Sequence, residues 1–250
     1  MTMSGDSQPG RALDKATRRA EKIARRQQEK LDAFRDQTIW QHKDALSRKI
    51  YADYDAYVAH QAAKLPQIQD RIETRATART EEFRERFRSL DLPRPASVLC
   101  LGARLGYEVQ AFIELGHFAV GIDLNPGEKN RYVVTGDFHN LVQADQSVDC
   151  VYTNCCDHIF DVAALAREVR RVLKPRGVFV ADIVAGYEEG ETVGEFDAMH
   201  WPKASGFAAL LCAEGPFKLR TFEELPVRTP NRWFRAVMRV RQPGETARAG

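Results

Sequence analysis

Apolar residues recur at the spacing of an α-helix through the first third of the chain. Residues 12–90 contain no glycine and one proline, Pro66, which suits the first turn of a new helix. We therefore expect residues 1–10 to be disordered and residues 11–92 to form an arm of two or three helices, the first one weakly amphipathic and mobile. The positions with helical spacing are Leu46, Ile50, Tyr54, Tyr57, Val58, Ile68, Ile72, Phe83, Phe87 and Leu90.

After Pro95 the pattern changes to short apolar runs that alternate with helical segments. The runs typical of strands are 97–101, 118–122, 132–135, 148–153 and 177–184. Helical patterns cover about 106–115 and 161–173. Such alternation predicts an α/β domain with a parallel sheet covered by helices.

The last part of the chain follows another pattern. A polar loop near 186–200 and a helix near 203–213 precede two β-rich runs, 217–222 and 233–240. The linker between these runs is too short for a helical crossover, which a parallel pair would need. We therefore expect an antiparallel pair that closes the sheet.

Composition excludes several classes of protein. The chain is 44% hydrophobic and 29% charged, as is typical of a soluble globular protein. No apolar run approaches the roughly 18 residues of a membrane span, and the N-terminal residues are polar, so we expect a cytoplasmic protein without membrane insertion. The five cysteines are an odd number without a C-x-x-C pair. They are interpreted as reduced thiols, and neither a disulfide framework nor a metal site is expected.

The net charge of +2 is too small to indicate a nucleic-acid-binding protein. Basic residues nevertheless gather in the first helical stretch, where they outnumber the acidic ones. A solvated helix face is the preferred interpretation, and contact with RNA or another polyanion is the alternative. These residues are Lys15, Arg18, Arg19, Lys22, Arg25, Arg26 and Lys30.

The stretch "VLCLGARLGYEV", residues 98–109, has the pattern of a strand, a glycine turn and a helix start. Backbone N–H groups at such a turn bind anionic or polar ligand groups. A second strand ends at Asp123, about 20 residues after Gly102, where a carboxylate can hold a ribose hydroxyl. A nicotinamide fingerprint that starts at Gly102 needs glycine at positions 104 and 107, which are Arg104 and Tyr107. A nicotinamide cofactor is therefore not expected.

The arrangement instead resembles the class I S-adenosylmethionine-dependent methyltransferases over roughly residues 95–185. Their first motif, acid-x-G-x-G-x-G, stands here as "CLGARLG", in which Gly102 and Gly106 match, Cys100 replaces the acid and Arg104 the middle glycine. Later motifs of the family are matched in order by "VGIDLNPG", "VVTGDFHNL", "QSVDCVYTNCCDHIFD" and "AREVRRVLKPRGVFVADI". The resemblance implies a Rossmann-like, mostly parallel seven-stranded sheet with an antiparallel C-terminal strand. It places the methyltransferase domain at 93–242, after the helical arm, and leaves 243–250 as a tail.

The resemblance also implies the cofactor, S-adenosyl-L-methionine, and its contacts. Asp123 matches the acid that holds the ribose, and Asp137 matches the residue that accepts from the adenine amine. Glu108 is a candidate partner for the cofactor ammonium in place of Cys100, and Arg104 either turns to solvent or pairs with the cofactor carboxylate. The short link after Asp123 predicts a loop where related proteins have a helix. The complete set of expected cofactor contacts is Gly102, Ala103, Arg104, Gly106, Asp123, Leu124, Asp137, Phe138 and Asn154.

Two histidines are candidates for a general base that deprotonates the methyl acceptor. His158 follows the fourth strand of the domain, and His200 lies in "FDAMHW", where the family commonly binds acceptors. For both, packing or capping is the alternative role. An aromatic and polar band in the arm is a candidate lid over the acceptor, with packing as the simpler role. The band consists of Tyr51, Tyr54, Tyr57, His60 and Gln61.

The expected function is methyl transfer to an oxygen or nitrogen atom of a small-molecule or glycan-type acceptor, by a monomer or homodimer. An RNA or protein methyltransferase docked by the basic arm is one alternative. It is disfavoured because Thr153-Asn154-Cys155-Cys156 stands where enzymes that methylate base amines have an Asn-Pro-Pro-aromatic sequence. The other alternative, suggested by Cys100 and Arg104, is a binding protein that has lost catalysis.

Overall fold

The computed structural model describes residues 17–18, 21–22, 24–25, 28–29, 32, 34, 38–43, 46–128, 130–227 and 231–241. Residues 1–10, the tail at 243–250 and four of the seven basic residues singled out in the arm lie outside this set. Arg25, which is described, forms an exposed ion pair with Glu29 at 3.5 Å.

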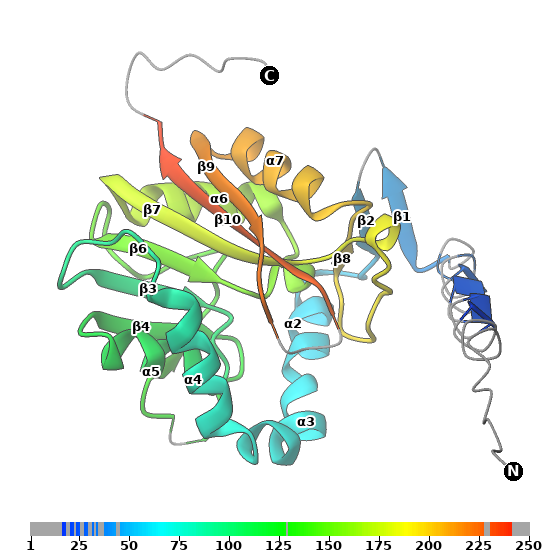
Figure 1. The fold of residues 1–250 in the computed structure, drawn as a ribbon, viewed down its shortest axis with the longest axis horizontal. Coiled ribbons are helices and arrows are strands. Elements are labelled where there is room, and N and C mark those ends of the chain that lie inside the picture. The colour runs from blue at the N-terminus through cyan, green and yellow to red at the C-terminus, as the bar shows by residue number, and fades with distance from the viewer. Residues whose placement is uncertain are drawn as a thin grey trace, which may run out of the picture.

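A seven-stranded sheet forms the centre of the domain, in the order β5-β4-β3-β6-β7-β10-β9 (Figure 1). β3 to β7 are parallel to one another, and β10 runs antiparallel to both β7 and β9. The expected fold class is therefore confirmed. The strands are β3 (Ser97–Leu101), β4 (Phe118–Asp123), β5 (Val133–Thr135), β6 (Val148–Thr153), β7 (Leu173–Val184), β9 (Phe217–Glu224) and β10 (Trp233–Val240).

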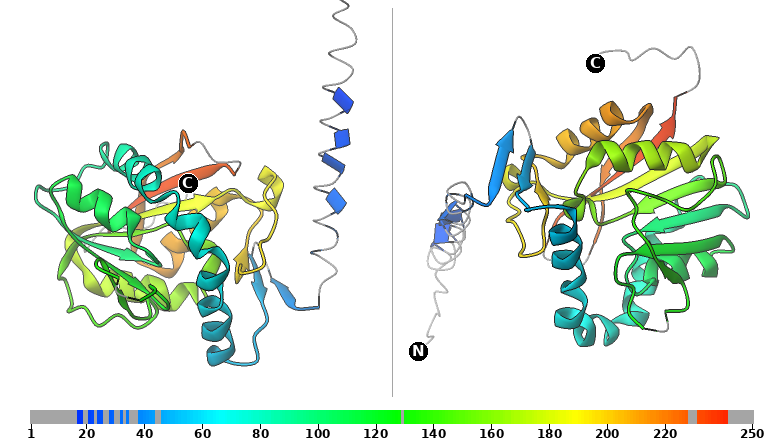
Figure 2. Two further views of the ribbon diagram at one scale, coloured as in Figure 1. Left: turned by 90° about the horizontal axis from the view of Figure 1, so that it is seen from below. Right: turned by 180° about the vertical axis from the view of Figure 1, so that it is seen from behind.

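Helices cover both faces of this sheet (Figure 2). α4 (Ala76–Phe87) and α5 (Tyr107–Glu114) pack on one face through a cluster that includes Phe87, Phe112 and Tyr152. α6 (Val162–Val172) and α7 (Ala204–Glu214) pack on the other face. The inner positions of β6 and β7 are almost continuously buried, as expected of parallel strands covered on both sides.

The helical interpretation of the arm is correct for the described residues between 17 and 34 and for most of residues 54–87, and it is wrong for residues 40–49. α2 (Tyr54–Ala62), α3 (Lys64–Glu73) and α4 follow one another, and Pro66 lies in the first turn of α3 as predicted. Residues 40–49, however, form a hairpin of β1 (Trp40–Lys43) and β2 (Leu46–Lys49), so Leu46 belongs to a strand. β2 pairs with β8 (Met199–His200), a strand inside the segment expected to be a polar loop. Local periodicity does not reveal this small sheet, because its third strand, β8, lies about 150 residues from β2 along the chain.

The link between α6 and β7 is also shorter than expected. α6 ends at Val172 and β7 begins at the next residue, so the strand starts earlier than residue 177. The described part of the link from Asp123 to β5 contains no helix, as predicted, and two short 3-10 helices occur at Cys156–His158 (η1) and Tyr187–Glu189 (η2).

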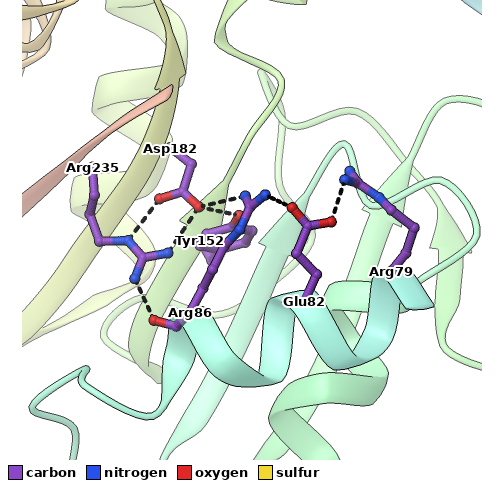
Figure 3. A network of polar contacts seen from close by, with 6 residues as sticks. All are labelled: Arg79, Glu82, Arg86, Tyr152, Asp182 and Arg235. Atoms are coloured by element: carbon purple, nitrogen blue, oxygen red, sulfur yellow. Dashed lines mark hydrogen bonds and ion pairs between the residues drawn. The ribbon is translucent and has the colours of Figure 1, made fainter. Parts of the chain in front are cut away.

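A buried ionic network fastens α4 to the sheet (Figure 3). Arg235 on β10 donates two hydrogen bonds to Asp182 on β7, at 2.8 and 2.9 Å. Tyr152 on β6 donates to the same carboxylate at 2.8 Å. Arg235 also donates to the backbone oxygen of Arg86 at 2.6 Å, and the Arg86 guanidinium lies 3.6 Å from Asp182. The last helix of the arm is thereby part of the domain core.

Candidate active site

The glycine turn lies between β3 and α5, at the carboxyl edge of the sheet. Gly102 and Gly106 have φ angles of 67° and 80°, in the left-handed region that favours glycine. A Cβ on Gly102 would lie 2.2 Å from the Cys155 sulfur, so the close approach also requires glycine. Arg104 has a φ of 44°, which explains why related sequences carry a third glycine at this position.

Asp123 closes this turn from the tip of β4. Its carboxylate accepts hydrogen bonds from the backbone N–H of Arg104 at 2.9 Å and of Asn125 at 2.8 Å. Burial raises the pKa of Asp123, although both N–H groups and the Arg104 guanidinium work in the opposite direction. Each carboxylate oxygen keeps a lone pair, so Asp123 can still accept from a ligand hydroxyl.

A cavity of about 480 Å³, here called the main cavity, opens beside the turn. It is lined by the glycine turn, by α3 and α4, by the end of β6 with η1, and by the start of β10. Four of its lining residues have basic side chains: Lys64, Arg75, Arg79 and Arg104. Two are acidic: Glu108 and Asp157. Asn154, an expected cofactor contact, also lines it.

The two residues that replace or supplement the usual acid have different surroundings. Cys100 is fully buried in the core under α4 and α5, and it does not line the main cavity. Glu108 lines that cavity while its side chain is largely buried. Burial raises the pKa of Glu108 to about 7. Glu108 can therefore bind a cationic group in the main cavity, and Cys100 cannot.

A second, small cavity of about 30 Å³ lies on the other side of the turn, between the sheet and α2. Its walls include Gly102, Asp123 and Leu124, together with Phe138 and Tyr57. This volume is about that of one water molecule. An adenosine group can therefore occupy this side of the turn only after α2 moves away.

The aromatic and polar band of the arm holds α2 in this position. The Tyr54 hydroxyl donates to Asp137 at 2.5 Å, and the Tyr57 hydroxyl donates to the backbone oxygen of His158 at 2.9 Å. Gln61 donates to the backbone oxygen of Phe196 at 2.8 Å. The band thus packs on the domain and covers the side of the turn that holds the small cavity, and none of its five residues lines the main cavity.

Asp137 is engaged within the protein in this arrangement. Its second oxygen accepts from the backbone N–H of His139 at 2.8 Å, and the His139 ring lies 2.9 Å away. Burial acts to raise the pKa of Asp137, but the hydrogen bonds from His139 and Tyr54 lower it overall. Asp137 is ionised at neutral pH and able to accept from an amine when Tyr54 withdraws.

The two candidate bases lie in different places. His158 lines both cavities, and burial lowers its pKa to about 4. His200 lies on β8, 2% exposed, with its ring against Phe34 and Tyr187. It lines neither the main nor the small cavity, so the structure does not bring His200 to the turn.

Several residues of the main cavity were not singled out from the sequence. Lys64 and Arg79 belong to the arm, and Trp233 begins β10. Each looks like an ordinary surface or core residue in the sequence, because nothing local indicates that α3, α4 and β10 meet at the glycine turn.

These residues fit S-adenosylmethionine. Asp123 places a carboxylate against the glycine turn, where it can accept from ribose hydroxyls. Asp137 can accept from an amine. The Phe138 side chain is 5% exposed and provides an apolar wall. The main cavity offers opposite charges, Glu108 and Arg104, for an amino-acid group that carries both an ammonium and a carboxylate. No helix in the described part of the chain is long and apolar enough to cross a membrane.

Comparison with solved structures identifies the same fold. The Burkholderia thailandensis 1,6-didemethyltoxoflavin-N1-methyltransferase, solved with 1,6-didemethyltoxoflavin and S-adenosylhomocysteine, is 18% identical, with a TM-score of 0.62 over 81% of this chain and 99% of its own. A Thermotoga maritima methyltransferase, described as a possible histamine N-methyltransferase, is 16% identical, with a TM-score of 0.53 over 71% and 98% of the two chains. A methyltransferase from Aquifex aeolicus is 14% identical, with a TM-score of 0.50 over 64% and 89%.

The search of curated proteins finds no match to this sequence. Residues 99–181, from β3 into β7, match the family model described as a methyltransferase domain. This segment contains the glycine turn, Asp123, Asp137 and the end of β6, which together form the site described above. Residues 99–181 are therefore similar to a methyltransferase domain, and the sheet has the Rossmann-like fold of S-adenosylmethionine-dependent methyltransferases.

Proposed function

We propose that the enzyme methylates an oxygen or nitrogen atom of a small-molecule or glycan-type acceptor held in the main cavity. The observation that carries this proposal is the cavity itself, about 480 Å³ beside the glycine turn and walled by α3, α4 and the start of β10. This volume is typical of small-molecule sites. RNA-binding proteins use an open basic surface, whereas the turn of this protein borders a cavity.

Different residues of the site bind different parts of S-adenosylmethionine in this proposal. Asp123 binds the ribose hydroxyls, and Asp137 accepts from the adenine amine between Leu124 and Phe138. The turn residues Gly102, Ala103 and Gly106 present the backbone there. Glu108 would bind the cofactor ammonium and Arg104 its carboxylate, and Asn154 would be a further cofactor contact in the main cavity.

When bound, S-adenosylmethionine supplies a methyl group already activated by its sulfonium. The protein must then orient the acceptor and exclude water. Closure of α2 through Tyr54, Tyr57 and Gln61 serves the second task. The Burkholderia enzyme of the same fold was solved with 1,6-didemethyltoxoflavin and S-adenosylhomocysteine, which supports a small-molecule acceptor here.

The direct test is incubation of the protein with isotopically labelled S-adenosylmethionine and a cellular metabolite extract, followed by mass spectrometry. We expect a labelled product of low mass that depends on the enzyme. Label in RNA or protein instead, with salt-sensitive binding that is lost when Arg18, Lys22 and Arg25 are neutralised, would support the docked alternative. Calorimetry with S-adenosylhomocysteine tests the remaining alternative, a protein that has lost catalysis. A folded protein that shows no binding would support this alternative.

Affinity for S-adenosylhomocysteine should depend on pH through Glu108. Only the ionised carboxylate attracts the ligand ammonium, and its pKa is raised to about 7 by burial. As the pH falls below about 7 the carboxylate becomes protonated, so we expect the affinity to fall roughly tenfold between pH 7 and pH 5.5.

Isothermal calorimetry over this range measures the effect directly. The Glu108→Gln variant should bind more weakly at pH 7.5 and lose most of the pH dependence. Glu114→Gln, which changes an exposed residue of the same helix, should retain the wild-type profile. A pH profile that persists in Glu108→Gln would assign it to another group.

A cytoplasmic location belongs to the same proposal. All five cysteines are free thiols, and four of them are buried. A reducing compartment preserves such thiols.

A further inference from the structure

We propose that Lys64 is the general base that receives the proton of the methyl acceptor, in place of either histidine candidate. The inference rests on the proposed function and specifies its acid–base chemistry. Lys64 lies in the first turn of α3, and its side chain lines the main cavity next to Arg104 and His158.

The hydrogen bonds of His158 show why this histidine is not free to act as the base. Its Nδ1 lies 3.0 Å from the backbone oxygen of Phe196, which can only accept, so Nδ1 carries the proton. The basic nitrogen of the neutral ring is therefore Nε2. The Lys64 amine lies 2.5 Å from Nε2 and must donate to it. His158 thus has no remaining lone pair with which to accept a proton from a substrate.

Lys64, unlike His158, can accept a proton from a bound substrate. A neutral lysine amine donates one N–H to Nε2 and keeps its own lone pair. Because Lys64 lines the main cavity, that lone pair is available to a group bound there. The Lys64 amine also lies 5.8 Å from the centre of the Phe196 ring, which adds an apolar wall.

Charged and titratable groups surround Lys64 from several elements. Burial lowers its pKa, although the carboxylates of Asp157 and Asp197 work in the opposite direction and the Arg104 guanidinium adds to the decrease. Burial together with the Asp157 carboxylate raises the pKa of Asp197, which weakens that carboxylate as a counter-charge for Lys64. The other groups that interact electrostatically with Lys64 are Cys155, Asp123 and His60.

Lys64 receives the proton that the acceptor loses during methyl transfer. The acceptor's O–H or N–H bond breaks, its proton moves to the Lys64 amine, and its electron pair forms the new bond to the methyl carbon. The bond between that carbon and the cofactor sulfur would break at the same time, with its electron pair left on the sulfur. Lys64 becomes an ammonium and keeps its hydrogen bond to Nε2 of His158. Proton loss to solvent then restores the neutral amine. Because the neutral form is the active one, the rate should rise with pH towards a plateau whose midpoint lies below the ordinary lysine pKa of about 10.4.

Competitive acetylation of the wild-type enzyme tests the protonation state without an acceptor. The protein is treated with trace acetic anhydride at a series of pH values, and modification of Lys64 and of the exposed Lys203 is followed by peptide mass spectrometry. We expect the midpoint for Lys64 to lie well below that for Lys203. Equal midpoints, or a Lys64 that does not react while Lys203 does, would overturn the inference.

Variants test the role in turnover, with the metabolite extract described above as the source of acceptor. Lys64→Arg keeps a cation but cannot lose its proton, and Lys64→Ala removes the base. Both should reduce methyl transfer about 100-fold or more, the scale of general-base catalysis, while binding of S-adenosylhomocysteine stays within a few fold. Added methylamine should restore part of the activity of Lys64→Ala, which a purely structural role would not allow. Lys203→Met is the control and should remain active.

The outcomes separate this inference from the proposed function. Wild-type enzyme that forms no low-mass methylated product contradicts the proposed function. Wild-type enzyme that forms it, together with an equally active Lys64→Arg, contradicts only the role of Lys64.

Discussion

Replacing Asp182 with alanine should lower the free energy of unfolding by about 3–5 kcal/mol, as measured by urea denaturation at pH 7. Asp182 is fully buried and is the acceptor for two hydrogen bonds from Arg235, whose side chain is 2% exposed (Figure 3). Without the carboxylate, the Arg235 guanidinium remains buried with its charge unpaired. The Tyr152 hydroxyl loses its acceptor as well.

Two further variants make this prediction specific. In Asp182→Leu combined with Arg235→Met, both charges are absent, so most of the lost stability should return. Glu224→Ala removes an ion pair with Arg232 of similar geometry, but both side chains are about half exposed. Its cost should be only a small fraction of that of Asp182→Ala, because solvent screens an exposed ion pair. A loss of similar size in Asp182→Ala and Glu224→Ala would show that burial does not govern the Asp182 pair.

Replacing Asp123 with alanine should weaken S-adenosylhomocysteine about 100-fold while the protein remains folded. Asp123 is held at the tip of β4 by two backbone N–H groups, so its carboxylate is oriented before the ligand binds. Hydrogen bonds from ribose hydroxyls to this charged group account for about 3 kcal/mol, which corresponds to that change in Kd. Calorimetry gives the affinity, and circular dichroism confirms the fold.

Asp145→Ala provides the comparison for this variant. Asp145 is 72% exposed, pairs with Arg171 and lines neither the main nor the small cavity. Its removal should leave ligand affinity unchanged. Unaltered binding in Asp123→Ala would instead show that the glycine turn does not hold the nucleoside.

The local pattern was sufficient for most of the domain. The strands β3 and β6 were predicted with their observed bounds, because buried parallel strands carry continuous apolar runs. The glycine turn was equally clear, since Gly102 and Gly106 adopt φ angles that other residues avoid. The exchange of helix for hairpin at 40–49 was missed, because four-residue strands show too little periodicity.

The candidate catalytic residues could not be ranked from sequence. His158 and His200 look alike there, each a histidine near the carboxyl edge of the sheet. The structure separates them by contacts: His200 is enclosed by aromatic rings, and the basic nitrogen of His158 faces Lys64. A side chain's hydrogen-bond partners come from distant segments, so they are not encoded in its neighbours along the chain.

The α/β fold, the cofactor class and the position of Asp123 could be read from the chain, because each follows from the spacing of residues within one strand–turn–helix unit or its repeat. Three features depend on long-range contacts instead: α2 covers the Asp123 side of the turn, Lys64 contacts His158, and α4 is fastened through Asp182 and Arg235. These contacts join residues about 80 to 150 positions apart. Their formation depends on how the arm folds back over the sheet, which no local periodicity specifies.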